Sequence, residues 1–273
     1  MNTHSTRSGH AAGAPCRVLL LGGSTEASAL ARALALRDGY DVTVSYAGRT
    51  RERVETPGRV RVGGFGGVEG LVRHLRDEHV DVVVDATHPF AAVMPHHVAR
   101  ACSMAGVPAL RVRRPAWEPV AGDQWHEVPD LDAAADAIAG AAARRVFLTT
   151  GRQDLVPFAA LSDVWFLVRA IEPPDPMPLA NATVILDRGP FATESERALM
   201  CEHRIDIVVS KNSGGSAAAG KLAAARELGL PVVMVARPAP SALPQVSTVA
   251  DALAWLTRTV APSSRPHDAR EPG

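Results

Sequence analysis

Short apolar runs alternate with longer segments in which apolar positions recur at helical spacing, and this alternation continues along most of the chain. The run DVVV (Asp81 to Val84) is almost continuously apolar, which is typical of a strand buried on both faces of a parallel sheet. The apolar runs predict strands at residues 18–21, 41–46, 60–62, 81–84, 109–112, 145–149, 164–168, 183–186, 205–209 and 231–235. The longer segments predict helices at residues 27–36, 68–78, 92–104, 130–143, 194–202, 217–228 and 248–257.

Strands that alternate with helices predict an α/β fold with parallel sheets built from right-handed crossovers. The alternation breaks between Arg113 and Glu127, where two prolines, two tryptophans and mixed charges occur. We therefore expect two Rossmann-like domains with mostly parallel sheets, at residues 16–120 and 121–260, and an interdomain cleft. Residues 1–15 are expected to be a disordered leader and residues 261–273 a disordered tail, because both are polar or rich in proline and charge.

Composition excludes several classes of partner. The chain has 273 residues, is 47% hydrophobic and has a formal net charge of zero. No basic stripe occurs, so neither nucleic acid nor an anionic membrane is an expected partner. No apolar run approaches the roughly 20 residues that span a bilayer, and the leader lacks the apolar segment of a signal peptide. We therefore expect a cytoplasmic protein.

Three cysteines, Cys16, Cys102 and Cys201, are far apart in the sequence and form no C-x-x-C pair. Neither a zinc site nor a disulfide framework is expected from this spacing. The prediction is three buried thiols in a reducing cytosol, with no metal site.

Small, hydroxylic and basic residues follow the predicted strands at their carboxyl ends, where open α/β sheets bind ligands. In GGSTEA (Gly22 to Ala27), a strand passes through two glycines into a helix, so backbone N–H groups at the helix N-terminus can bind a pyrophosphate. The dinucleotide fingerprint would have glycine at the positions of Ser24 and Ala27. A Ser24 hydroxyl that donates to phosphate can compensate, and a tight turn without a ligand is the alternative.

The next loop, SYAGR (Ser45 to Arg49), indicates which cofactor is bound. An enzyme that prefers NADH usually has Asp or Glu near this position to bind the ribose hydroxyls, whereas this chain has Ser45, Gly48 and Arg49. A guanidinium binds a 2′-phosphate in bidentate fashion, whereas a carboxylate repels it. The loop therefore favours NADPH.

The loop DATHPF (Asp85 to Phe90) follows the DVVV strand. His88 precedes proline and is therefore expected to be extended. Asp85 and His88 form an acid–base pair in one interpretation; in the other, Asp85 caps the loop and His88 is structural.

Three loops in the second half bring basic residues to strand ends: TTGR with Arg152, DRGPF with Arg188, and SKNSGG with Lys211. Two guanidiniums suggest a substrate with carboxylates, although each could instead form a surface ion pair. In SKNSGG, Ser213 and the glycines after it are expected to enter a helix and to form a second anion-binding N-terminus. Lys211 can neutralise an anion or donate a proton, unless it is only a solvated lysine.

Taken together, GGSTEA, SYAGR, DATHPFA, TTGR, RGPF and SKNSGG resemble, in order and in spacing, the motifs of the precorrin-6A reductase family. The resemblance runs from about Arg17 to Leu256, and DATHPFA together with SKNSGG is its most specific part. It implies two Rossmann-like domains with the active site between them. It also implies hydride transfer from NADPH to a double bond of precorrin-6A, giving precorrin-6B in cobalamin biosynthesis, without metal or flavin. The tetrapyrrole substrate carries many carboxylates, in agreement with the basic loops. A further expectation is transient contact with neighbouring pathway enzymes.

These considerations assign expected roles to individual residues. Cofactor binding is assigned to Gly22, Gly23, Ser24, Thr25 and Glu26 at the pyrophosphate, to Ser45, Gly48 and Arg49 at the 2′-phosphate, and to Thr87, His88 and Pro89 beside the nicotinamide. Tetrapyrrole binding is assigned to Arg152, Arg188, Lys211, Asn212 and Ser213. The catalytic candidates are His88 and Lys211, and the proton donor stays open between these two side chains and an ordered water.

Two other functions stay open at this point. One is another NADPH-dependent reductase of a cyclic imine such as dihydrodipicolinate, which would need fewer basic residues in the second domain. The other is a non-catalytic NADPH-sensing module, in which SKNSGG would have no ligand.

Overall fold

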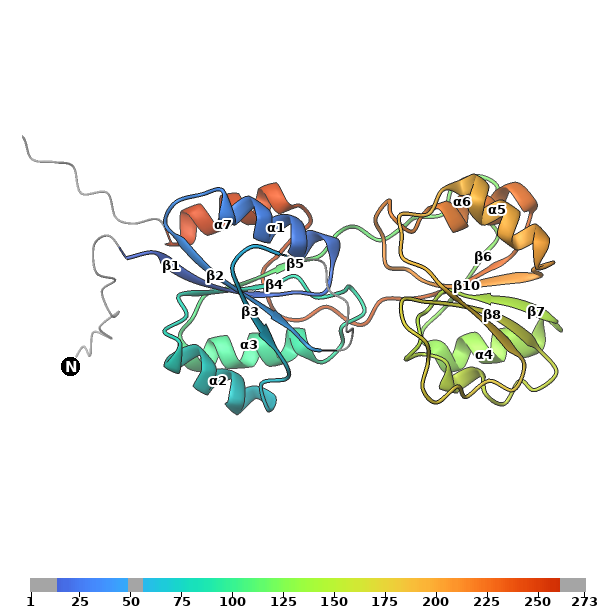
Figure 1. Ribbon diagram of the computed structural model, residues 1–273, viewed down its shortest axis with the longest axis horizontal. Helices are drawn as coiled ribbons and strands as arrows, with labels where there is room; N and C mark the ends of the chain where they lie inside the picture. Colours follow the sequence, from blue (N-terminus) through green and yellow to red (C-terminus); the bar gives the residue numbers. More distant parts are fainter. Residues whose placement is uncertain (1–13, 49–55, 261–273) are drawn as a thin grey trace, which may run out of the picture. The chain divides into compact units, whose positions relative to one another are not determined.

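The computed structural model describes residues 14–48 and 56–260, which form two compact units of similar construction (Figure 1). Each unit is a six-stranded sheet with helices on both faces, and every strand pair is parallel. This confirms the predicted α/β class and the two Rossmann-like sheets. Apart from Ala14 and Pro15, the expected leader and tail lie outside the described residues.

The first unit contains the strand order β12-β5-β4-β1-β2-β3. Its strands are β1 (Cys16–Leu21), β2 (Tyr40–Tyr46), β3 (Arg59–Val62), β4 (Val82–Asp85), β5 (Ala109–Val112) and β12 (Gln245–Val246). Its helices are α1 (Thr25–Ala35), α2 (Gly67–Asp77), α3 (Met94–Ala105) and α7 (Val249–Val260).

Helices α1 and α7 cover one face of this sheet, and α2 and α3 cover the other (Figure 1). Along β1, Val18 and Leu20 pack toward α1 and α7, whereas Leu19 and Leu21 pack toward α2 and α3. The strand is therefore apolar at consecutive positions because both of its faces are buried.

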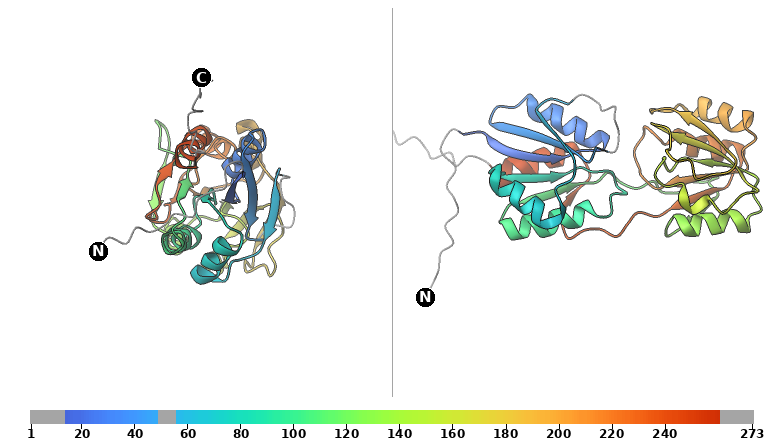
Figure 2. Two further views of the ribbon diagram at one scale, coloured as in Figure 1. Left: turned by 90° about the vertical axis from the view of Figure 1, so that its left-hand side faces the viewer. Right: turned by 60° about the horizontal axis from the view of Figure 1, so that its bottom comes forward.

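The second unit contains the strand order β6-β11-β10-β7-β8-β9. Its strands are β6 (Trp125–Val128), β7 (Arg145–Leu148), β8 (Trp165–Ala170), β9 (Ala182–Leu186), β10 (Ile207–Lys211) and β11 (Val232–Val235). Its helices are α4 (Leu131–Gly140), the 3-10 turn η1 (Val156–Phe158), α5 (Thr193–Glu202) and α6 (Gly220–Leu228). Helix α4 and η1 pack on one face of this sheet, and α5 and α6 pack on the other. Figure 2 shows both units from two further directions.

Each sheet contains one strand that the sequence analysis did not predict, and one of the two, β12, comes from the expected second domain but belongs to the first sheet. Strand β6 follows β5 in sequence but pairs with β11 of the second unit, and β12 follows β11 but pairs with β5 of the first. Ala252 and Leu256 of α7 are fully buried in the core of the first unit. The expected division at residues 16–120 and 121–260 therefore differs from the structure, because residues 241–260 belong with the first unit and residues 89–92 and 114–120 with the second.

None of the helices in the described ranges is both long and apolar enough to cross a membrane.

The placement of α7 gives a stability test. Leu256→Ala should lower the free energy of unfolding by about 2–5 kcal/mol, because it leaves a cavity in the fully buried core beside α1. Urea unfolding followed by circular dichroism measures the loss. The control is Thr259→Ala at an exposed position of the same helix, with an expected change within about 0.5 kcal/mol. A Leu256→Ala protein as stable as this control would show that α7 does not complete the core.

Candidate functional site

In the first unit, two predicted cofactor loops flank the point where the strand order reverses. Strand β1 lies between β4 and β2, so GGSTEA after β1 and DATHPF after β4 leave the sheet at the same edge. The Ser24 hydroxyl joins them, because Ser24 Oγ donates to the Ala86 carbonyl oxygen at 2.7 Å. Open α/β sheets bind their ligands at such a reversal point.

Ser24 is also the N-cap of α1, since its Oγ accepts from the Ala27 N–H at 3.1 Å. Its hydroxyl proton is directed at Ala86 and is not available to a phosphate in this geometry. The donors suited to an anion are instead the backbone N–H groups in the first turn of α1, which have no partner within the helix. Thr25 begins that turn and Glu26 follows it.

The two glycines of GGSTEA have separate structural reasons. A Cβ added to Gly22 would lie 2.6 Å from a ring carbon of Tyr46, so the tyrosine at the end of β2 requires glycine there. Gly23 has a φ of +125°, a conformation that residues with side chains rarely adopt. Packing against Tyr46 thus explains Gly22, and backbone geometry explains Gly23. Neither explanation depends on the dinucleotide fingerprint, from which the loop departs.

At the end of β2, Ser45 is buried and its Oγ accepts from Nη1 of Arg61 at 3.2 Å. The Arg61 guanidinium also donates to the carbonyl oxygens of Gly63 at 2.6 Å and Gly64 at 2.7 Å, and it stacks on the Phe65 ring at 3.8 Å. Burial lowers the pKa of Arg61. The sequence analysis missed this arginine, although its place beside Ser45 in the β2–β3 register is a usable signal.

Two further residues were expected at the 2′-phosphate, Gly48 and Arg49. Gly48 follows β2 with a φ of +77°, and Arg49 lies outside the described residues.

In DATHPF, Asp85 is fully buried and acts as a cap. Its Oδ1 accepts from the Thr87 N–H at 3.0 Å and from the Thr87 hydroxyl at 2.7 Å. Its Oδ2 has no hydrogen-bond partner among the described residues, and Arg111 Nε lies 3.8 Å away. Burial raises the pKa of Asp85, opposed by the Thr87 hydrogen bonds and the Arg111 charge. The capping interpretation of Asp85 is therefore the one that this geometry favours, and it fixes the orientation of Thr87.

His88 and Pro89 follow on the same loop. His88 is half-buried and Pro89 is buried, and the division between the two units falls between them.

In the second unit, the neighbouring order β10-β7-β8-β9 brings the three basic loops to one sheet edge. Two of their cations are already paired. Arg152 lies 2.9 Å from the Glu172 carboxylate, and Lys211 Nζ donates to Asp154 Oδ2 at 2.6 Å. The Lys211 ammonium also lies 5.3 Å from the Phe90 ring centroid. Arg188 is exposed at the end of β9, and its backbone N–H donates to Asp187.

The structure corrects the expectation for SKNSGG. Helix α6 begins only at Gly220, so Ser213 and the following glycines do not enter a helix. A Cβ on Gly214 would lie 1.9 Å from the Pro115 carbonyl oxygen, which shows that the chain at Arg114 and Pro115 packs against this loop. The loop is therefore not a second helix N-terminus for an anion.

Asn212 is engaged by the same packing. Its Oδ1 accepts from the Trp117 N–H at 2.8 Å, and its Nδ2 donates to the Trp117 carbonyl oxygen at 3.0 Å. The Ser213 carbonyl oxygen accepts from Arg114 Nε at 2.8 Å. Asn212 thus supports the loop with both of its side-chain polar atoms.

A cavity of about 360 Å³ in the first unit is lined by none of the predicted site residues, although Arg61, which binds Ser45, is part of its wall. It is lined by side chains of β1, β2, β3 and α2, among them Arg17, Asp41, Arg59, His74 and Glu78. Two of its charged groups bind partners on its own wall: Arg59 pairs with Asp41 at 2.7 Å, and Arg17 donates to the Glu78 carbonyl oxygen.

The cysteines and the other potential metal ligands were compared with the expectation of three buried thiols. Within residues 14–48 and 56–260, no group of three or more His, Cys, Asp or Glu side chains is arranged to hold a metal ion. Cys16 and Cys102 are buried, and burial raises the pKa of both thiols to about 12. Cys201 is exposed on α5, so the expectation of a third buried thiol was wrong.

Comparison with known proteins identifies the family. Residues 17–257 match the family model described as precorrin-6x reductase CbiJ/CobK. The chain belongs to this family. A precorrin-6A reductase from Rhodococcus erythropolis is 49% identical over 241 residues, which are 88% of this chain and 97% of the relative. A solved structure described as CobK precorrin-6A reductase has a TM-score of 0.84 and 44% identity, and covers 90% of this chain and 98% of its own.

A more distant relative carries a different name. The cobalt-precorrin-6A reductase of Priestia megaterium is 31% identical over 81% of this chain and 90% of its own length. The function of the present chain is that of a precorrin-6A reductase in cobalamin biosynthesis, an oxidoreductase that acts on a tetrapyrrole. Such a reduction implies a nicotinamide cofactor.

Proposed function

We propose that this precorrin-6A reductase takes its hydride from NADPH, which is bound by the first unit at the loops after β1, β2 and β4. The observation that carries the proposal is the hydrogen bond from Ser24 Oγ to the Ala86 carbonyl oxygen at 2.7 Å. This bond fixes GGSTEA and DATHPF to each other beside the N-terminus of α1. A helix N-terminus at the reversal point of a parallel sheet is suited to a pyrophosphate.

The residues around this point fit the dinucleotide. Backbone N–H groups from Gly23 to Glu26 are suited to the pyrophosphate, and a glycine at position 22 leaves the Tyr46 ring in place beneath the turn. Thr87, oriented by Asp85, borders the nicotinamide together with His88 and Pro89. When bound, NADPH supplies the hydride that converts precorrin-6A to precorrin-6B.

The preference for NADPH rests on charge. From Ser45 to Gly48 no carboxylate occurs, and the Arg61 guanidinium is held beside Ser45 by hydrogen bonds to two loop carbonyls. Arg49 supplies a second positive charge for the 2′-phosphate. A carboxylate at this strand end would favour NADH instead.

We assign the tetrapyrrole to the second unit. Its carboxylates meet Arg152, Arg188 and Lys211, while Asn212 and Ser213 hold the loop that follows Lys211. Because Arg152 and Lys211 are paired with Glu172 and Asp154, substrate carboxylates compete with protein carboxylates for these cations. His88 of the first unit, Lys211 of the second unit and an ordered water are the candidate proton donors for the carbon beside the one that accepts hydride. The proposed setting is the cytoplasm, with transient contacts to neighbouring pathway enzymes.

The activity is tested directly by mixing purified protein with NADPH and enzymatically prepared precorrin-6A and following the oxidation of the cofactor. We expect oxidation that depends on precorrin-6A and is faster with NADPH than with NADH. Cobalt-precorrin-6A serves as the comparison substrate, because a relative with that name shares only 31% identity. Folded protein that binds NADPH but shows no oxidation above background would refute the assignment.

The position of the pyrophosphate is tested at Ser24. Ser24→Asp keeps an N-cap acceptor for Ala27 but places a negative charge where the phosphate is expected. We expect the dissociation constant for NADPH to rise by about tenfold or more, equivalent to at least about 1.4 kcal/mol, in fluorescence titrations.

Ser24→Ala is the matched control for this variant. It should cost about 1 kcal/mol of stability through the lost cap and should weaken NADPH binding less than Ser24→Asp does. Equal affinity of the two variants for NADPH would move the pyrophosphate away from this helix.

The position of the 2′-phosphate is tested at Arg49. Arg49→Ala should raise the KM for NADPH by roughly one to two decades through loss of a charged contact worth about 1.5–3 kcal/mol. The KM for NADH should change little, because NADH carries no 2′-phosphate. If the preference for NADPH over NADH survives the substitution, the 2′-phosphate is bound elsewhere.

A further inference from the structure

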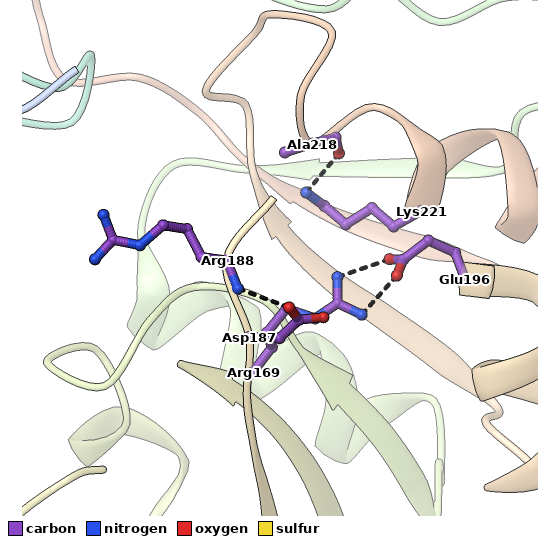
Figure 3. A network of polar contacts seen from close by, with 6 residues as sticks. All are labelled: Arg169, Asp187, Arg188, Glu196, Ala218 and Lys221. Carbon is purple, nitrogen blue, oxygen red and sulfur yellow. Dashed lines mark hydrogen bonds and ion pairs between the residues drawn. The ribbon is translucent and has the colours of Figure 1, made fainter. Parts of the chain in front are cut away.

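A buried charge cluster lies in the second unit, between the sheet and the helices α5 and α6 (Figure 3). Arg169 on β8, Glu196 on α5 and Lys221 on α6 are 7%, 2% and 5% exposed, respectively. Arg169 donates to both Glu196 oxygens, from Nη1 at 2.8 Å and from Nη2 at 2.6 Å. Lys221 Nζ donates to the Ala218 carbonyl oxygen at 3.0 Å. The sequence analysis assigned no role to these three residues.

Fold stability alone does not explain this cluster. Replacing a buried ion pair by apolar residues of similar volume is often neutral or stabilising, because the desolvation of both charges is unfavourable. Strand β8 reads WFLVRA, so Arg169 interrupts an otherwise apolar strand. Its Nε has no hydrogen-bond partner among the described residues. With Lys221 protonated, the three groups carry a net positive charge in the interior.

The cluster contacts the two loops that precede α5 and α6. The Arg169 guanidinium lies 4.0 Å from the ring centroid of Phe191, in the loop that carries Arg188. Lys221 holds Ala218, in the loop that follows Lys211, and its ammonium lies 4.9 Å from the Trp117 ring centroid. Each cationic member of the cluster therefore holds one of the loops assigned to the substrate.

The two loops are also joined directly to each other. The Phe191 N–H donates to the Ala217 carbonyl oxygen at 3.0 Å. A Cβ on Gly220 would lie 2.4 Å from the Phe191 carbonyl oxygen, so the start of α6 is in close contact with the Arg188 loop. The Arg188 side chain extends away from the buried Arg169–Glu196 pair (Figure 3). One buried cluster thus lies beneath an exposed cation that is assigned to the substrate.

We propose that Arg169, Glu196 and Lys221 are positioning residues that hold the loops 187–192 and 212–219 in one geometry and thereby place Arg188 for a carboxylate of the tetrapyrrole. This inference rests on the proposed role of Arg188 in substrate binding. The three residues act through the loops and do not themselves touch the substrate.

Lys221 makes the geometry sensitive to pH. Burial lowers its pKa to about 7, while the facing Glu196 carboxylate on α5 raises the pKa and the facing Arg169 guanidinium on β8 lowers it. The uncharged ring of Trp117 covers the ammonium on another side. A charged amine donates more strongly to Ala218 than a neutral one does and is attracted to Glu196. The loop is therefore held most firmly below about pH 7, and the restraint weakens as the pH rises through that value.

The test uses two variants that replace charge by apolar volume, so that the core stays filled. Lys221→Met removes the amine, and the double variant Arg169→Met with Glu196→Leu removes the pair. We expect each variant to raise the KM for precorrin-6A by about tenfold, because the contact of Arg188 with a substrate carboxylate is misplaced. The kcat and the dissociation constant for NADPH should change little.

In the wild type, the KM for precorrin-6A should rise between about pH 6 and pH 8, and Lys221→Met should abolish that rise.

The controls separate this inference from the proposed function. Arg197→Met removes an exposed charge from the same helix α5 and should leave every parameter unchanged. Arg188→Ala tests whether Arg188 binds the substrate, through its effect on the KM for precorrin-6A. If Arg188→Ala raises the KM for precorrin-6A but neither cluster variant does, positioning by the cluster is refuted and the substrate role of the loop stands. If Arg188→Ala also leaves that KM unchanged, both the substrate role of this loop and the inference fail. Should Lys221→Met not fold, the double variant decides by the same KM.

Discussion

The structure depends on one constraint, the burial of parallel strands on both faces. A parallel pair needs a crossover connection, and the helices of these crossovers cover the sheet from both sides. Consecutive residues of β1 accordingly pack into different helix layers. Because all strands of a sheet point the same way, their following loops leave at one edge. The loops that we propose for cofactor and substrate binding are therefore held in place by buried apolar strands.

The same constraint explains which parts of the fold were predictable. The central strands are apolar at consecutive positions, and nearly all of them were predicted within one or two residues. Strands β6 and β12 were missed because WHEV is partly exposed and QV is only two residues long. An amphipathic helix such as α7 shows which of its faces is buried but not which sheet it covers. The return of residues 241–260 to the first unit therefore had no local signal.

For the candidate site, the sequence predicted that these loops follow the strands, as the structure shows. It did not reveal what the side chains of the loops contact. Ser24 was expected to bind phosphate, yet its hydroxyl joins two loops; Asn212 was expected to face the substrate, yet it binds the Trp117 backbone. Partners such as Glu172 and Asp154 are distant in sequence or carry no motif, so the pairing of Arg152 and Lys211 could not be read from spacing. The reaction was identified from the resemblance to a family, which rests on the order and spacing of the loop motifs. That resemblance does not require knowledge of what each side chain contacts.

The paired cations have a consequence for recognition of a polycarboxylate. An unpaired cation at a sheet edge would attract many anions, whereas Arg152 and Lys211 each already interact with a protein carboxylate. A ligand gains from such a cation only if its own carboxylate offers better geometry than the one it displaces, since the Coulomb energies are otherwise similar. Discrimination then depends on several carboxylates arriving together at fixed spacing, as on the rim of a rigid macrocycle. If the buried charge cluster holds the loops 187–192 and 212–219 as we propose, it fixes the position of Arg188 for such a ligand before binding.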